Sequence, residues 1–134
     1  MRRLFLFVFV VGLLAAPAAP SAAAVPSGAP TLVRSVASAD TVTVTWGPPT
    51  RTGGAPVTGY RIARDGTDST GGGPYATSVR AASRTFTFTL LRPGYTYAMT
   101  VQAITRVGTG RAAIVRVTTK GAGLTMSVAI TPIN

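Results

Sequence analysis

The sequence contains no cysteine, no histidine and no glutamate. Without cysteine, it has no disulfide framework, no lipid-acylated cysteine and no thiolate metal ligand. Without histidine or cysteine, neither a Ser-His-Asp nor a Cys-His nucleophile system can be assembled. A folded domain of this chain must therefore be held by its apolar core, and the commonest hydrolytic machineries are excluded.

Carboxylates are almost as scarce, because Asp40, Asp65 and Asp68 are the only acidic residues. A glycosidase needs two carboxylates across a cleft, and calcium usually takes six to eight oxygen ligands. Asp65 and Asp68 fall in one loop, where a local Asx turn is favoured over a weak calcium site. Gly71-Gly72-Gly73 lacks the Lys-Ser/Thr of a phosphate-binding loop. The sequence predicts no catalytic, cofactor or metal site, and therefore no enzyme.

The net charge is +10 and comes almost entirely from arginine. Two interpretations stay open: attraction to an acidic polymer, an anionic lipid or a polyanionic cell wall, or a merely solvated surface that keeps the protein soluble. Tyr75 and Tyr95 are the only aromatic candidates for stacking on a sugar or a base, and they lack a defined platform. No specific nucleic-acid site is predicted.

Residues 1–24 are typical of a signal peptide, with Arg2 and Arg3 before an apolar run over 4–16 and small residues after it. The run is shorter than the about 20 residues that span a bilayer, so we expect removal, before Val25 or at the earlier Ala-Pro-Ala, and no membrane span afterwards. The predicted localisation is extracellular. Residues 25–29 are predicted to be a linker with too little apolar content to pack.

The rest of the chain has room for one domain, and its periodicity is that of strands rather than helices. Gly- and Pro-rich turns separate the apolar alternations. Seven short strands are expected, at about 32–36, 41–46, 57–64, 76–80, 85–90, 95–104 and 113–119. Among the connections, 65–74 is expected to be a flexible turn and the least ordered part of the domain, and 105–112 is expected to be a loop.

The alternation also selects the residues that should fill the core. They are Trp46, Tyr60, Ile62, Phe86, Phe88, Leu91, Tyr97 and Val101. Tyr97 follows a Pro93-Gly94 corner, and the backbone of that corner is a suitable partner for its hydroxyl, as in the tyrosine corner of sandwich domains. Arg64 shares a strand face with Tyr60 and Ile62, so it either caps the core layer or extends to solvent.

Residues from about 30 to 119 resemble a fibronectin type III domain. The resemblance rests on Trp46, Pro56-Val57-Thr58-Gly59-Tyr60-Arg61-Ile62, Leu91-Arg92-Pro93-Gly94, Tyr97, Ala103 and the Gly108/Gly110 hairpin. It implies an all-β, immunoglobulin-like, seven-stranded antiparallel β-sandwich with sheets of three and four strands, preceded by the signal peptide. It also implies a non-catalytic module for adhesion, spacing or recognition. The chain departs from the family at Gly71–Gly73, and 105–112 has no Arg-Gly-Asp, so integrin-type adhesion is not expected.

These observations favour a secreted module that contacts a protein or a cell-surface polymer, with an anionic envelope or a polysaccharide as candidates. The alternative is a spacer or weak glycan-binding accessory of an extracellular polysaccharide-degrading system. Loops gather at the two ends of a sandwich. The candidate partner-binding residues are therefore the loop arginines Arg51, Arg106 and Arg111.

Residues 120–134 form a tail beyond the predicted domain, and within it Leu124, Met126, Val128 and Ile130 alternate with polar or small residues. Three interpretations remain open: a disordered end, an extra strand on an edge of this or a neighbouring molecule, or the first strand of a following domain.

Overall fold

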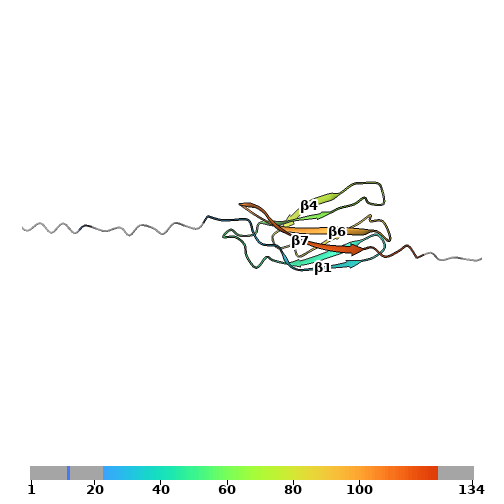
Figure 1. Ribbon diagram of the computed structural model, residues 1–134, viewed down its shortest axis with the longest axis horizontal. Coiled ribbons are helices and arrows are strands. Elements are labelled where there is room, and N and C mark those ends of the chain that lie inside the picture. The colour runs from blue at the N-terminus through green and yellow to red at the C-terminus, as the bar shows by residue number, and fades with distance from the viewer. Residues whose placement is uncertain (1–11, 13–22, 124–134) are drawn as a thin grey trace, which may run out of the picture.

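The computed structural model describes residue 12 and residues 23–123 (Figure 1). Most of the expected signal peptide and the alternating part of the tail lie outside these residues. The described chain forms seven strands: β1 (Thr31–Ala37), β2 (Val42–Gly47), β3 (Gly59–Arg64), β4 (Tyr75–Arg80), β5 (Thr85–Phe88), β6 (Thr96–Thr105) and β7 (Gly108–Thr118).

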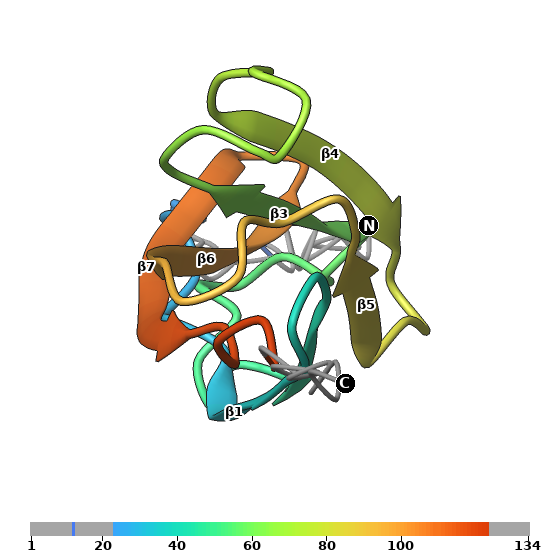
Figure 2. The ribbon, with the colours of Figure 1, turned by 90° about the vertical axis from the view of Figure 1, so that its right-hand side faces the viewer.

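The strands form two antiparallel sheets that pack face to face. One sheet has the order β1-β2-β5 and the other has the order β4-β3-β6-β7. Figure 2 looks along the sandwich and shows these two layers. The predicted seven-stranded β-sandwich, with sheets of three and four strands, is confirmed.

The core lies between the sheets and follows the period of two. Along β6, Tyr97, Met99, Val101 and Ala103 are almost completely buried. Among the core residues selected from the sequence, the structure buries Trp46, Tyr60, Ile62, Phe88, Leu91, Tyr97 and Val101 to 4% exposure or less. Phe86 is only partly buried and packs against this cluster, because β5 is an edge strand with one open side.

A tyrosine corner ties β6 to two loops. The Tyr97 hydroxyl accepts a hydrogen bond from the Arg92 amide at 2.9 Å, and it donates one to the Thr67 carbonyl, also at 2.9 Å. Gly94 supplies the left-handed backbone, φ +72°, that the corner requires. The expected corner is present, and it also holds the loop over 65–74.

Removing this hydroxyl should leave the Arg92 amide and the Thr67 carbonyl without their partner. We expect Tyr97→Phe to lower the unfolding free energy by about 1–2 kcal/mol, measured from urea unfolding curves. The matched control is Tyr95→Phe, because Tyr95 is 52% exposed. An equal effect of the two substitutions would contradict the role given to the corner.

Two strand boundaries differ from the expectation, and that of β7 differs by more than the usual fraying. The predicted loop over 105–112 is wrong, because β7 begins at Gly108 and only Arg106 and Val107 separate it from β6. Gly108 permits this tight return with φ +132°, and a register shift between Gln102 and Ile104 accommodates it. β5 ends at Phe88, two residues early, because Leu90 adopts φ +58° and cannot continue a strand.

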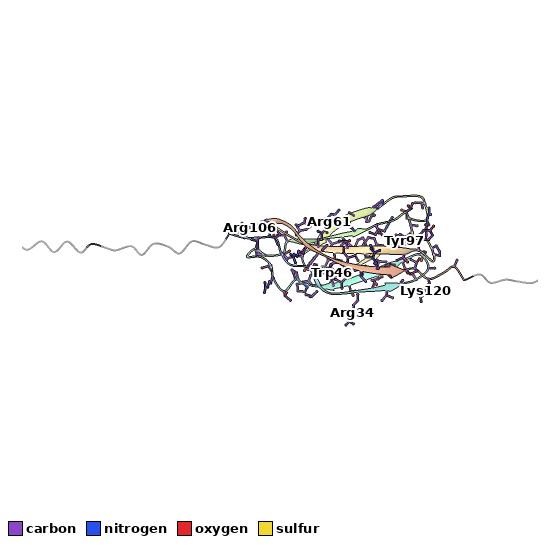
Figure 3. The ribbon with its side chains drawn as sticks, in the orientation of Figure 1. Arg34, Trp46, Arg61, Tyr97, Arg106 and Lys120 are labelled. Carbon is purple, nitrogen blue, oxygen red and sulfur yellow. The ribbon has the colours of Figure 1, made fainter. Side chains whose placement is uncertain are left out.

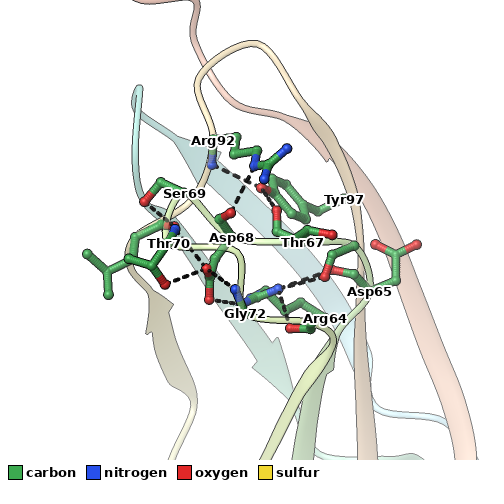
Figure 4. Close-up of polar contacts among 12 residues, drawn as sticks. Arg64, Asp65, Thr67, Asp68, Ser69, Thr70, Gly72, Arg92 and Tyr97 are labelled. Carbon is green, nitrogen blue, oxygen red and sulfur yellow. Dashed lines mark hydrogen bonds and ion pairs between the residues drawn. The ribbon is translucent and has the colours of Figure 1, made fainter.

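The loop over 65–74, expected to be the least ordered part, is held by Asp68 (Figure 4). Its Oδ1 accepts hydrogen bonds from the Thr70 amide, the Thr70 hydroxyl and the Gly72 amide, at 2.9, 2.7 and 2.7 Å. The Thr70 hydroxyl bond, followed by the Gly72 amide bond, lowers the pKa of the Asp68 carboxyl below its ordinary value. The Asx turn is confirmed, and it organises the whole loop.

Arg64 closes the core layer against this loop rather than extending to solvent. Its Nη1 donates to the carbonyls of Gly66 and Gly73 at 3.0 and 3.2 Å, with a longer contact of 3.4 Å to Asp65. Its Nη2 pairs with Asp68 Oδ2 at 2.9 Å. The side chain is 5% exposed. Of the two alternatives left open for Arg64, the structure therefore shows the cap.

Candidate interaction surface at the arginine end

Charge is segregated between the two ends of the sandwich. All three aspartates lie in the connections 38–41 and 65–74, which the antiparallel topology places at one end. The connections 48–58, 81–84 and 106–107 lie at the opposite end. We call this the arginine end, because it carries Arg51, Arg80, Arg84, Arg106 and Arg111. With every aspartate at the other end, its arginines face no carboxylate from their own sandwich.

The three arginines selected from the sequence occupy different positions within this end. Arg51 is exposed in the connection between β2 and β3, and Arg106 is exposed in the β6–β7 turn. Figure 3 shows Arg106 at this end and Lys120 at the other. Arg111 lies on β7 and not in a loop, which corrects the expectation. Arg51 and Arg111 line one pocket of about 580 Å³, whereas Arg106 does not line it.

Two further arginines were not selected from the sequence. Arg80 ends β4 opposite Gly59, and Arg84 closes the β4–β5 turn. The Arg84 guanidinium donates to the carbonyls of Ala81 and Ser83 at 2.6 and 2.8 Å, and it lies 5.4 Å from the centre of the Tyr60 ring. The same reasoning that loops gather at the ends, applied to the turn at 81–84, would have found both.

Residues 25–28 close over the arginine end, and we call them the N-terminal strap. Val25 N donates to Gly53 O at 2.9 Å, Gly28 N donates to Arg51 O at 2.8 Å, and Arg111 N donates to Ser27 O at 3.0 Å. Ser27 is 1% exposed. The expectation that this segment does not pack is therefore wrong, because backbone hydrogen bonds hold it where apolar side chains are lacking.

The strap approaches two glycines too closely for any side chain. A Cβ on Gly53 would collide with the Val25 carbonyl, and Gly53 also has φ +75°. A Cβ on Gly110 would collide with the Ser27 hydroxyl and lie 2.5 Å from the Ser27 carbonyl oxygen. Glycine at both positions is therefore what allows the strap to dock.

A smaller pocket of about 300 Å³ lies at the opposite end, between the start of β4 and the end of β5. Its wall includes Phe86, Phe88 and Tyr75, and Tyr75 is 47% exposed. Tyr75 and Phe88 meet edge to face with their ring centres 6.4 Å apart. Of the two tyrosines considered for stacking, Tyr75 lines this pocket, whereas Tyr95 lies beside Arg92 and does not line it.

The residues that the structure describes contain neither a metal-ligating cluster nor a membrane-spanning helix. No three acidic side chains gather there into a group that could hold a metal ion. The same residues include no helix that is long and apolar enough to cross a membrane.

The two-sheet topology, the tyrosine corner and the loops gathered at both ends define an immunoglobulin-like β-sandwich module. The model of one family, the fibronectin type III domain, matches residues 28–119. The chain belongs to this family.

Solved structures show the same fold. The chain is 28% identical to the FN5 domain of Drosophila Lar, with a TM-score of 0.56, and the match covers 73% of this chain and 100% of that one. The chicken CNTN1 FN1-FN3 structure is 22% identical, with a TM-score of 0.59, and the match covers 71% of this chain and 32% of that one. The fourth FNIII domain of a human protein is 21% identical, with a TM-score of 0.61, and the match covers 81% and 91%. No curated protein matches the sequence.

Proposed function

We propose that the protein is a secreted, non-enzymatic fibronectin type III module that contacts an anionic protein or cell-surface polymer through its arginine end. The observation that carries this proposal is the segregation of charge: five arginines lie at one end and all three aspartates lie at the other. Fibronectin type III domains commonly mediate protein interactions and are common in extracellular proteins, which agrees with the signal peptide predicted over 1–24.

The arginines of this end act together because no carboxylate of the same end neutralises them, so their electrostatic potentials add. A partner that approaches the arginine end meets a positive potential that no carboxylate of that end reduces. Salt screens exposed charges over about 10 Å at 0.1 M, so this attraction should weaken steadily as salt is added. Contact through the arginine end is therefore expected to depend on salt and on position, and not on net charge alone.

The test compares two double variants with the same loss of charge. Arg51→Gln/Arg106→Gln neutralises two arginines of the arginine end, and Arg34→Gln/Arg116→Gln neutralises two exposed arginines on the outer sheet faces. On immobilised polygalacturonate, we expect the unaltered chain to elute between about 50 and 200 mM salt. The arginine-end variant should elute earliest, and the sheet-face variant should remain close to the unaltered chain. Coincident elution of the two variants would refute the proposal.

The pocket at the opposite end supports a second candidate function, that of a weak glycan-binding accessory or spacer module. Tyr75 is exposed at this pocket beside the polar side chains of Arg64 and Asp68, and aromatic faces combined with polar groups suit sugars. Retention on an insoluble neutral polysaccharide in high salt, lost in Tyr75→Ala, would support this function. Release by salt alone would count against it.

A further inference from the structure

We infer that the pocket beside the N-terminal strap binds a single oxyanion group, a carboxylate or a phosphate. This inference rests on the proposed function, because it names the chemical group through which an anionic partner would engage the arginine end. The pocket of about 580 Å³ is lined by the strap itself, by Gly53 and by the side chains of Arg51 and Arg111.

The strap brings the two arginines together from distant parts of the sequence. Arg51 accepts a hydrogen bond from Gly28 through its carbonyl, and Arg111 donates one to Ser27 through its amide, at 2.8 and 3.0 Å. Both backbones are therefore pinned to neighbouring residues of one short segment. Both side chains are exposed, and neither guanidinium makes a hydrogen bond to another residue within 23–123. Each is available for the two parallel hydrogen bonds with which arginine binds a carboxylate or phosphate.

The Ser27 hydroxyl of the strap lies against Gly110. Ser27 lines the pocket, and its Oγ is buried without a hydrogen-bond partner among the described residues. Buried hydroxyls almost always have a partner, because leaving one unpaired costs free energy. Because this Oγ is inaccessible while the strap is closed, an oxyanion held by the two arginines satisfies it only when the strap shifts.

Charge favours an anion over any other small ligand. All three aspartates lie at the opposite end, so an anion in the pocket meets no carboxylate at this end. The strap forms one wall of the pocket, and it can be displaced without disrupting the sandwich because it precedes β1 and rests on Gly110. A single Cβ at Gly110 should displace Ser27 while leaving both arginines in the chain.

The experiment titrates the ¹⁵N-labelled chain with sodium phosphate, and separately with sodium glucuronate, at constant ionic strength. We expect saturable shifts of the Gly28, Gly53 and Arg111 amides. Gly110→Ala and Arg111→Gln should each weaken binding by about tenfold, the loss expected when charge-assisted contacts are removed. Arg116→Gln removes an exposed arginine of β7 that lies outside the arginine end, and it should leave the affinity unchanged. Unchanged β4 and β5 amide spectra, far from the substituted strand, would show that Gly110→Ala still folds.

The two titrations separate the sources of the anion. Saturation by phosphate alone identifies a phosphate-bearing partner, and saturation by glucuronate alone identifies an acidic sugar or carboxylate partner; each supports the inference. Shifts that rise linearly without saturation, or equal weakening by Arg116→Gln and Arg111→Gln, would overturn it. Polymer retention that depends on Arg51 and Arg106 but not on Gly110 would leave the proposed function intact while the pocket fails. Saturable phosphate binding, combined with polymer retention that does not depend on the arginines of the arginine end, would support the pocket and refute the proposed function.

Discussion

Trp46→Ala should lower the unfolding free energy by about 3–5 kcal/mol, the usual cost of truncating a buried aromatic side chain. Trp46 is 4% exposed, and its ring centre lies 5.5 Å from that of Tyr60 on the facing sheet, so the indole joins the two sheets. Small domains are stable by only about 5–15 kcal/mol, and this one has no disulfide to compensate. The variant is therefore expected to be marginally folded at room temperature.

Urea unfolding followed by far-ultraviolet circular dichroism measures this cost, because Trp46 is the only tryptophan and its fluorescence disappears with it. Trp46→Phe is the informative control. The indole Nε1 is buried without a hydrogen-bond partner among the described residues, so phenylalanine loses volume but no hydrogen bond. Trp46→Phe should therefore lower the unfolding free energy clearly less than Trp46→Ala does. A loss below about 1 kcal/mol for Trp46→Ala would place the indole outside the core.

The sandwich could be predicted because the core signal is local in the sequence. Along β6, every second side chain is apolar and buried, and the Pro93-Gly94 corner marks where that strand begins. The start of β7 could not be found in this way. Residues 108–112 are small or charged and show no alternation, and their strand conformation comes from pairing with β6. Pairing with a neighbouring strand leaves no mark in the sequence of the strand itself.

Part of the arginine end was likewise accessible from sequence. Arg51 and Arg106 were placed at one end by the rule that sandwich loops gather there, and the structure agrees. The strap was missed because its contacts are backbone hydrogen bonds to Gly53, Arg51 and Arg111, which no side-chain pattern records. The available hint was the pair Gly53 and Gly110, whose reason for being glycine becomes clear only when the strap is seen against them.

The loop over 65–74 shows the opposite error, in which composition suggested too little order. Its glycines predicted flexibility, yet Asp68 gathers Thr70 and Gly72, and Arg92 Nε donates to the Asp68 carbonyl at 2.8 Å. The Thr70 hydroxyl bond, followed by the Gly72 amide bond, lowers the pKa of the Asp68 carboxyl, which therefore stays ionised at neutral pH and keeps accepting these hydrogen bonds. The hydrogen bonds of one aspartate therefore order this loop despite its glycine-rich composition.

Arg64→Met should lower the unfolding free energy by about 2–3 kcal/mol, because hydrogen bonds from a charged group are among the stronger ones and the Arg64 side chain that makes them is buried. Methionine keeps much of the apolar stem but cannot donate to the carbonyls of Gly66 and Gly73 or pair with Asp68. The loop then loses its connection to β3, while the Asx turn within it remains. The expected result is a less stable domain with a loosened loop and an intact sandwich.

Urea unfolding followed by Trp46 fluorescence gives the free energy, and amide exchange of Ser69, whose N donates to Leu90 O outside the loop, reports on how firmly the loop is attached. The matched control is Arg61→Met, the same substitution on the same strand. Arg61 is exposed on the outer face and makes one 3.3 Å hydrogen bond to Gln102, so its loss should stay within about 0.5 kcal/mol. Equal losses in the two variants, or unchanged exchange at Ser69 in Arg64→Met, would mean that Arg64 does not hold the loop to the core. A large loss confined to Arg64→Met, with faster exchange at Ser69, would show that one buried arginine fastens to the core a loop whose internal turn is held by Asp68.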